Sequence, residues 1–221
     1  MRANIRVLAL ICFFLPLATV IISYIFSVKL NLVSACIPNF EGCSSISRAG
    51  RYPPVKFFFK PMMYIYTLTL FLYWFYFFKY LRQIKINNNY IFLLAFLSII
   101  FLCLYITFLG ESKIYSFFKR IGIYIYILFM VISQLLINRL LIINKKKITN
   151  YFNLYYCKIN FILSSLLVIS GLFLLPILIV KIENFPQIKN IISWNYFFFL
   201  QLYFLISFFS LKKKLSYPAT S

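Results

Sequence analysis

Long runs of apolar residues alternate with short polar segments along the whole chain of 221 residues. Six of these runs approach or exceed the length that a helix needs to cross the hydrocarbon core of a bilayer, about 20 residues. The runs occupy residues 7–28, 57–81, 90–109, 121–141, 159–180 and 196–211. This pattern predicts an all-α fold, a polytopic membrane bundle of six transmembrane helices.

The composition agrees with this pattern. The chain is 63% hydrophobic and 22% aromatic, with a mean hydropathy of +0.91, whereas a soluble domain is about 45–50% apolar. The longest segment between the runs, residues 29–56, is itself rich in apolar residues. We therefore expect residues 1–221 to form a single membrane domain, with residues 29–56 as its outer loop.

The formal net charge of +20 is of the kind found in proteins that bind nucleic acids. Here, however, the Lys and Arg residues fall in short segments between apolar runs, where basic residues set orientation and contact lipid phosphates. We therefore expect membrane lipids as partners and no nucleic acid. Whether the chain also binds another membrane protein or a second copy of itself stays open.

The distribution of basic residues predicts an orientation. With the N-terminus inside, thirteen of the 23 Lys and Arg residues lie on the inner side and ten on the outer side. Glu41, Glu111 and Glu183 then all lie outside. The first apolar run follows Arg2 and Arg6 but exceeds the 7–15 residues typical of a secretion signal, which favours a retained span. We expect a multi-pass protein of the plasma or inner membrane with both termini in the cytoplasm.

Side chains for common catalytic chemistry are scarce. The chain has no histidine, which removes imidazole as a general base and as a zinc ligand. Its three glutamates fall in three different loops, and no nucleotide-binding or hydrolase motif occurs. We expect no catalytic residue, no cofactor and no metal site. An enzymatic role stays open but is less favoured than a non-enzymatic one.

Two cysteines, Cys36 and Cys43, lie in the outer loop. Thiols outside the cytoplasm can oxidise, so these residues could form a disulfide. They could equally be two small free cysteines.

A basic run leads from the outer loop into the second apolar run and comprises Arg48, Arg51, Lys56 and Lys60. One interpretation is a set of contacts to the phosphate of a lipid headgroup at the outer leaflet. The other is that the charges are solvated, with their stems along apolar surface.

Residues 46–54 read Ile-Ser-Arg-Ala-Gly-Arg-Tyr-Pro-Pro and precede an aromatic run. This stretch resembles the I-S-x-x-G-x-x-P-P motif of the DRAM/Frag/Sfk family. These six-span membrane proteins include the damage-regulated autophagy modulators and relatives of the GPI-anchor lipid-remodelling protein. A second similarity is a tryptophan before the sixth span, although Ser193 stands where relatives often have an acidic residue. The resemblance implies the six-span architecture, places the motif in the first outer loop and marks as family positions Ile46, Ser47, Gly50, Pro53, Pro54 and Trp194.

The sequence thus predicts an integral membrane protein that interacts with lipids or modulates membrane assembly, with Trp194 at the membrane interface. Two alternatives stay open: a lipid-remodelling enzyme acting at the outer face, and a small-solute transporter. Polar residues within the spans either join helices by hydrogen bonds or line a path for a solute. These residues are Gln134, Asn138, Asn160 and Gln201.

Overall fold

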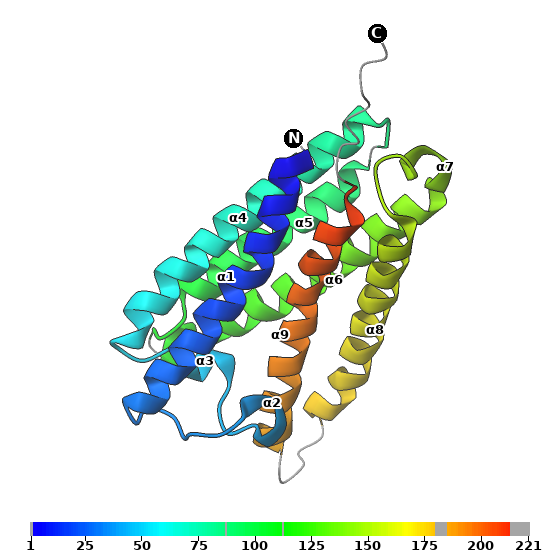
Figure 1. The fold of residues 1–221 in the computed structure, drawn as a ribbon. Helices are drawn as coiled ribbons and strands as arrows, with labels where there is room; N and C mark the ends of the chain where they lie inside the picture. Colours follow the sequence, from blue (N-terminus) through cyan, green and yellow to red (C-terminus); the bar gives the residue numbers. More distant parts are fainter. Residues whose placement is uncertain (1, 87, 112, 180–184, 213–221) are drawn as a thin grey trace.

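The structure, a computed structural model, describes residues 2–86, 88–111, 113–179 and 185–212. These residues form a bundle of long helices that run roughly side by side (Figure 1). Six helices within the described ranges are long and apolar enough to cross a membrane. This confirms the predicted fold class. They are α1 (Arg2–Lys29), α4 (Val55–Gln83), α5 (Asn89–Thr107), α6 (Ser116–Ile143), α8 (Leu154–Ile179) and α9 (Phe185–Ser210).

Four short elements lie at the ends of the long helices. The segment between α1 and α4 contains α2 (Pro38–Glu41) and α3 (Ile46–Ala49). A 3-10 turn, η1 (Lys113–Tyr115), precedes α6, and α7 (Lys145–Ile148) follows it. We call the end of the bundle that carries α2 and α3 the capped end, and the end that carries α7 the α7 end.

Neighbouring helices close the bundle into a ring. Helix α1 packs against α4, α4 against α5, α5 against α6, α6 against α8, α8 against α9, and α9 returns to α1. Each long helix therefore has two principal partners. The first and last helices of the chain lie side by side (Figure 1).

The interior combines aromatic packing with polar bonds between helices. The side chains of Tyr73 and Trp74 are almost wholly buried, and the Tyr73 ring meets Phe204 of α9 edge to face at 5.2 Å. Tyr66 of α4 donates a hydrogen bond to Gln201 Oε1 of α9 over 3.1 Å.

Amide side chains make further bonds inside the bundle. Asn160 Nδ2 of α8 donates to Ser207 Oγ of α9 over 3.0 Å, and Gln134 Nε2 of α6 donates to the carbonyl of Leu200 over 3.5 Å. Asn138 Nδ2 bonds within α6 to the carbonyl of Gln134. In a hydrocarbon environment, bonds between helices such as those of Asn160 and Gln134 contribute on the order of 0.6 kcal/mol each to helix association.

The predicted spans lie largely inside the observed helices, and the last one needs the largest change of boundary. The hydropathy pattern predicted a span over residues 196–211, whereas α9 starts at Phe185. Its first turns carry polar residues, among them Asn190 and Asn195, which lower the hydropathy of this stretch. Both side chains bond to the segment between α1 and α4, so the helix continues although the sequence is no longer purely apolar.

Helices α5 and α6 approach closely at a glycine. A Cβ atom added to Gly122 would lie 2.8 Å from the backbone nitrogen of Tyr105 and 2.9 Å from the carbonyl oxygen of Phe101. Both obstacles are backbone atoms, which move only if the two helices separate. Gly122 therefore allows the closest approach of α6 to α5.

Replacing Gly122 by alanine should destabilise the protein by about 1–3 kcal/mol, because an overpacked interface forces the two backbones apart. The matched control is Gly171→Ala in α8, where a Cβ would meet only the Tyr196 hydroxyl at an ordinary 3.5 Å. Thermal unfolding in detergent micelles measures both variants. A Gly122→Ala protein that melts at the wild-type temperature would contradict this packing.

Candidate functional site

The segment between α1 and α4, residues 30–54, folds back over one end of the bundle, and we call it the cap. Its short helix α2 ends at Gly42, which has a left-handed φ of +65°. A Cβ at Gly42 would also collide with the backbone of Gln187 in α9. The second short helix, α3, begins at Ser45, whose hydroxyl accepts a hydrogen bond from the backbone N–H of Arg48 over 3.2 Å.

Side chains of α9 hold the cap in place through its backbone carbonyls. Trp194 Nε1 donates to the carbonyl of Ser44 over 2.8 Å. Asn190 Nδ2 donates to the carbonyl of Gly42 over 2.8 Å, and Asn195 Nδ2 donates to that of Asn39 over 2.9 Å. These three donors lie within six residues of one helix, so the first turns of α9 serve as the platform on which the cap rests.

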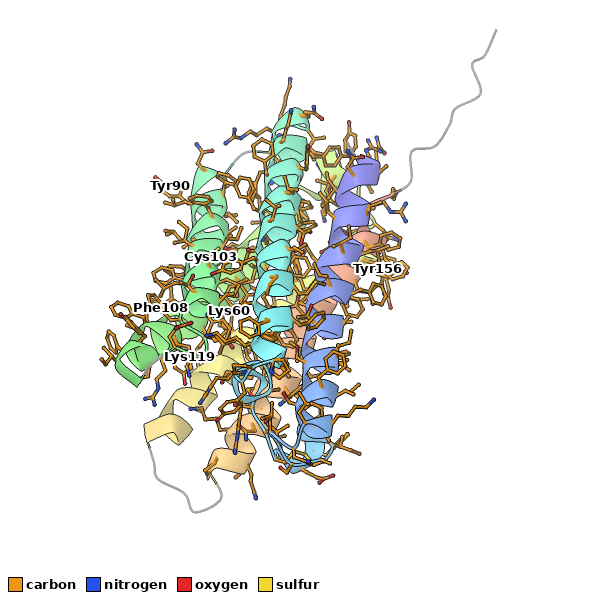
Figure 2. All side chains as sticks on the ribbon, turned by 90° about the vertical axis from the view of Figure 1, so that its left-hand side faces the viewer. Lys60, Tyr90, Cys103, Phe108, Lys119 and Tyr156 are labelled. Atoms are coloured by element: carbon orange, nitrogen blue, oxygen red, sulfur yellow. A yellow bond between two sulfur atoms is a disulfide. The ribbon has the colours of Figure 1, made fainter. Side chains whose placement is uncertain are left out.

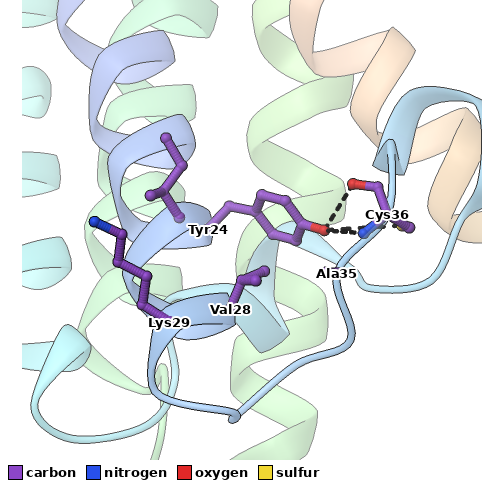
Figure 3. A pocket seen from close by; sticks show the side chains of 6 residues that line it. Tyr24, Val28, Lys29, Ala35 and Cys36 are labelled. Atoms are coloured by element: carbon purple, nitrogen blue, oxygen red, sulfur yellow. Dashed lines mark hydrogen bonds between the residues drawn. The ribbon is translucent and has the colours of Figure 1, made fainter.

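Helix α1 holds the cap from its other side. The Tyr24 hydroxyl accepts a hydrogen bond from Cys36 N over 3.0 Å and lies 2.9 Å from the Cys36 carbonyl oxygen, to which it donates (Figure 3). Ser27 Oγ donates to the carbonyl of Ala49 over 2.6 Å. Cys36 and Cys43 form a disulfide with their Cα atoms 6.3 Å apart, which is the first of the two alternatives that the sequence left open.

A shallow apolar groove of about 300 Å³ lies beside this contact (Figure 3). Its lining is Tyr24, Ile25, Val28, Lys29, Ala35 and Cys36. None of the four residues of the predicted basic run lines it, so the groove and the basic run are separate features.

Two members of the basic run share one carboxylate. Lys56 and Lys60 stand one helical turn apart on α4, and the Nζ atom of each lies 2.8 Å from Glu111 Oε1. Lys60 Nζ also donates to the carbonyl of Thr107 over 2.9 Å. Hydrogen bonds from Lys56, and then from Lys60, lower the pKa of Glu111 from an ordinary 4.5 to about 2. These two lysines therefore join α4 to the end of α5.

The two arginines of the run have no such partner. The Arg48 side chain is exposed. Arg51 is half-buried, and its Nε atom is buried without a hydrogen-bond partner among the described residues. Its guanidinium carbon lies 6.0 Å from the centre of the Tyr52 ring. Lys119 of α6 lies toward the same end of the bundle (Figure 2).

Lys119 joins these cations from a distant part of the sequence. Figure 2 shows Lys60, Phe108 and Lys119 toward the capped end of the bundle, whereas Tyr90, at the start of α5, lies near the opposite end. The capped end thus presents several positive charges and two described acids, Glu41 and Glu111, of which Glu111 is bound by two lysines. Neither of these described acids forms an ion pair with Arg51.

The positions marked by the family resemblance have structural contacts in the cap. Ile46 and Ser47 belong to α3, and a Cβ at Gly50 would lie 2.6 Å from the Phe59 ring. The cap runs into α4 through the cis peptide bond between Pro53 and Pro54. These residues shape the junction between the cap and α4.

The sequence placed Trp194 before the sixth span, but it lies within α9 with only 6% of its surface exposed. Its predicted place at the membrane interface stays a prediction. Its indole ring meets Tyr24 edge to face at 5.7 Å and bonds to the cap. Because the ring is enclosed between α1, α9 and the cap, it fixes the cap.

Some elements of the predicted pattern lie outside the described residues: Lys181, Glu183, Lys213 and Lys214. Within the described residues, no three His, Cys, Asp or Glu side chains come together in a way that could hold a metal ion. Sequence reasoning missed Glu111 and Lys119 as parts of the site. The one available signal for Glu111 was that a glutamate is rare in so basic a chain.

Comparison with known proteins identifies no relative. No protein-family model matches the chain, and no curated protein or solved structure matches it. The resemblance of residues 46–54 to the DRAM/Frag/Sfk motif therefore stays a prediction.

Lys56→Gln and Lys60→Gln should each raise the pKa of Glu111 from about 2 toward its ordinary 4.5, because each removes one stabilising hydrogen bond. The lowered pKa means that this contact stabilises the wild-type fold above about pH 4.5 and that the contribution is lost as the pH falls toward 2. A ¹³C-carboxyl titration of Glu111 in micelles measures the shift. The control is Lys29→Gln, an exposed lysine at the same end. A wild-type Glu111 that titrates near 4.5 would refute the shared contact.

Proposed function

We propose that this integral membrane protein binds phosphate-bearing lipid headgroups at its capped end, with Arg51 and Arg48 as the principal contacts. The observation that carries the proposal is the Arg51 side chain, whose Nε is buried and unpaired among the described residues. In a membrane protein, lipid phosphates are the most abundant anions at this depth.

The proposal depends on which positive charges at the capped end already have a carboxylate partner. Glu111 Oε1 accepts from Lys56 and Lys60, and among the described residues no ion pair joins Glu111 to either arginine. A buried donor without a partner is costly, by about 1–3 kcal/mol and more for a charged group. A phosphate oxygen would remove that cost through a charge-assisted bond, and the planar guanidinium suits such an anion in two-point geometry. Lys119 would gain from the same phosphate.

Orientation decides which leaflet supplies the phosphate. The excess of Lys and Arg at the α7 end favours that end in the cytoplasm, with both termini on the same side. The cap would then face the outside, where a disulfide such as Cys36–Cys43 is stable. The phosphates bound by Arg51 would belong to the outer leaflet of the plasma or inner membrane.

The similarity to the DRAM/Frag/Sfk family fits this proposal, because the motif residues build the cap and its junction with α4. The transporter alternative depends on buried polar side chains within the bundle. Gln134, Asn160 and Gln201 each make a hydrogen bond to a neighbouring helix. Their other polar atoms, Gln134 Oε1, Asn160 Oδ1 and Gln201 Nε2, are buried without a partner among the described residues, so this alternative stays open.

Replacing both arginines, Arg48→Gln with Arg51→Gln, should weaken binding of phosphatidylglycerol by about tenfold, since a hydrogen bond to a charged group contributes roughly 1.5–3 kcal/mol. Native mass spectrometry of the detergent-solubilised protein, titrated with phosphatidylglycerol and with phosphatidylcholine, measures the affinity. Arg51→Gln alone should account for most of the loss, because Arg48 is exposed.

The matched control is Lys189→Gln, which removes one exposed positive charge from the first part of α9. It should leave the affinity within about twofold of the wild-type value, as expected for a single solvated charge. In the decisive comparison, the proteins with and without the two arginines both also carry Lys145→Gln, Lys146→Gln and Lys147→Gln, so that binding at the other end of the bundle does not mask the change. If the double arginine variant then binds phosphatidylglycerol as tightly as the protein with both arginines, the headgroup proposal is wrong.

A further inference from the structure

The opposite end of the bundle carries a second ordered connection, residues 144–153 between α6 and α8. Its short helix α7 is fixed by two buried side chains, Ile148 and Phe152, each 0% exposed. Phe152 also pairs through its backbone with Leu211, just after α9. The connection is therefore packed into the bundle.

Backbone hydrogen bonds hold the same connection to the end of α9. Asn153 N donates to the carbonyl of Ser210 over 2.7 Å, and Lys212 N donates to that of Tyr151 over 3.1 Å. Lys212 Nζ donates to the carbonyl of Thr149 over 2.6 Å. These bonds fix the position of α7 relative to the end of α9.

Helix α7 carries three consecutive lysines, Lys145, Lys146 and Lys147, and all three are exposed. Of the three glutamates in the chain, Glu41 and Glu111 lie at the capped end, and Glu183 lies outside the described residues. No described acid neutralises the lysines, and the bond that Lys212 Nζ makes to a carbonyl leaves its positive charge uncompensated.

Two arginines at this end, Arg2 and Arg6, lie against aromatic rings, whereas five further Lys and Arg side chains on the neighbouring helix ends are exposed: Lys79, Arg82, Lys85, Arg139 and Lys158. Arg6 Nε, like Arg51 Nε, is buried without a hydrogen-bond partner among the described residues. The guanidinium carbon of Arg2 lies 4.8 Å from the centre of the Tyr151 ring, and that of Arg6 lies 4.4 Å from the centre of the Phe208 ring. These contacts tie the start of α1 to its neighbours by cation–π attraction. Arg2 and Arg6 thus differ from the three lysines of α7, for which no aromatic contact is found among the described residues.

Exposed apolar side chains beside α7 indicate what the lysines face. Ile143, at the end of α6, and Tyr155, at the start of α8, are each 67% exposed. Exposed aliphatic and aromatic side chains next to basic residues are typical of the boundary between acyl chains and headgroups. A soluble polyanion would leave both in water, whereas a bilayer would cover them and place the lysines among headgroup phosphates.

We propose that Lys145, Lys146 and Lys147, supported by Lys212, form a binding site for the headgroups of anionic lipids in the leaflet at the α7 end. A basic segment that only sets orientation needs charge but no fixed geometry. Here the three side chains are carried by a helix whose position two buried residues and the end of α9 determine. The site is distinct from that at Arg51, which lies at the opposite end of the bundle, and does not depend on it.

The test uses a fluorophore on Asn150→Cys, an exposed position beside α7, in liposomes that contain phosphatidylglycerol with a spin-labelled headgroup as a quencher. Each lysine near an anionic surface contributes on the order of fivefold in affinity. The triple variant Lys145→Gln, Lys146→Gln, Lys147→Gln should therefore need at least about tenfold more phosphatidylglycerol for half-maximal quenching. The triple variant to arginine keeps the charge and should behave as the wild type.

Spin-labelled phosphatidylcholine in the same assay measures quenching by lipid that is merely nearby, and the melting temperature of each variant verifies folding. Equal quenching curves for the wild type and the folded glutamine variant would overturn the proposal. So would equal quenching by the two lipids in the wild type. Repeating the titration with Arg48→Gln and Arg51→Gln separates the two sites, because that change should leave quenching at Asn150→Cys unaltered.

Discussion

Hydrocarbon offers no hydrogen-bond partner to a peptide group and no solvation to a charge, and this constraint determines most of the molecule. Backbone groups at membrane depth must be paired within helices, which agrees with the six long helices of the described chain. Charged side chains must gather at the two ends of the bundle. Lys56 at the capped end and Lys145 at the α7 end are examples. Polar side chains that stay inside, such as Gln201 and Asn160, bond to neighbouring helices or cost free energy.

Both ends are closed by ordered connections that cross between helices, but their charges have different partners. At the capped end, a single carboxylate takes up two lysines and leaves Arg51 without an acid. At the α7 end, aromatic rings contact two arginines, and the three lysines of α7 are exposed beside other exposed Lys and Arg side chains on the neighbouring helix ends. In each case the positive charge without a partner is the feature that points to an anionic ligand, and counting residues alone does not find it.

The apolar runs were sufficient to predict six helices, because hydropathy over 20 residues reflects the constraint directly. The start of α9 was not predictable in this way. Its polar first turns are stabilised by bonds from Asn190 and Trp194 to a segment some 150 residues earlier, and no local pattern records such a contact. The same holds for Glu111, which meets Lys56 across 55 positions of the chain. The basic run was predicted as one unit, and only the fold divides it into paired lysines and unpaired arginines.

The assignment of the two proposed lipid sites to opposite leaflets requires that the cap and α7 lie on opposite sides of the membrane, with the cap outside. Single cysteines at Tyr52→Cys in the cap and Asn150→Cys beside α7, labelled with a membrane-impermeant maleimide in intact cells, test this most directly. The unsubstituted chain measures the background from Cys12, Cys103 and Cys157. We predict labelling of Tyr52→Cys from outside and of Asn150→Cys only after the membrane is opened. Labelling of both positions from one side, or the reverse pattern, would contradict the assignment of the two sites to opposite leaflets with the cap outside.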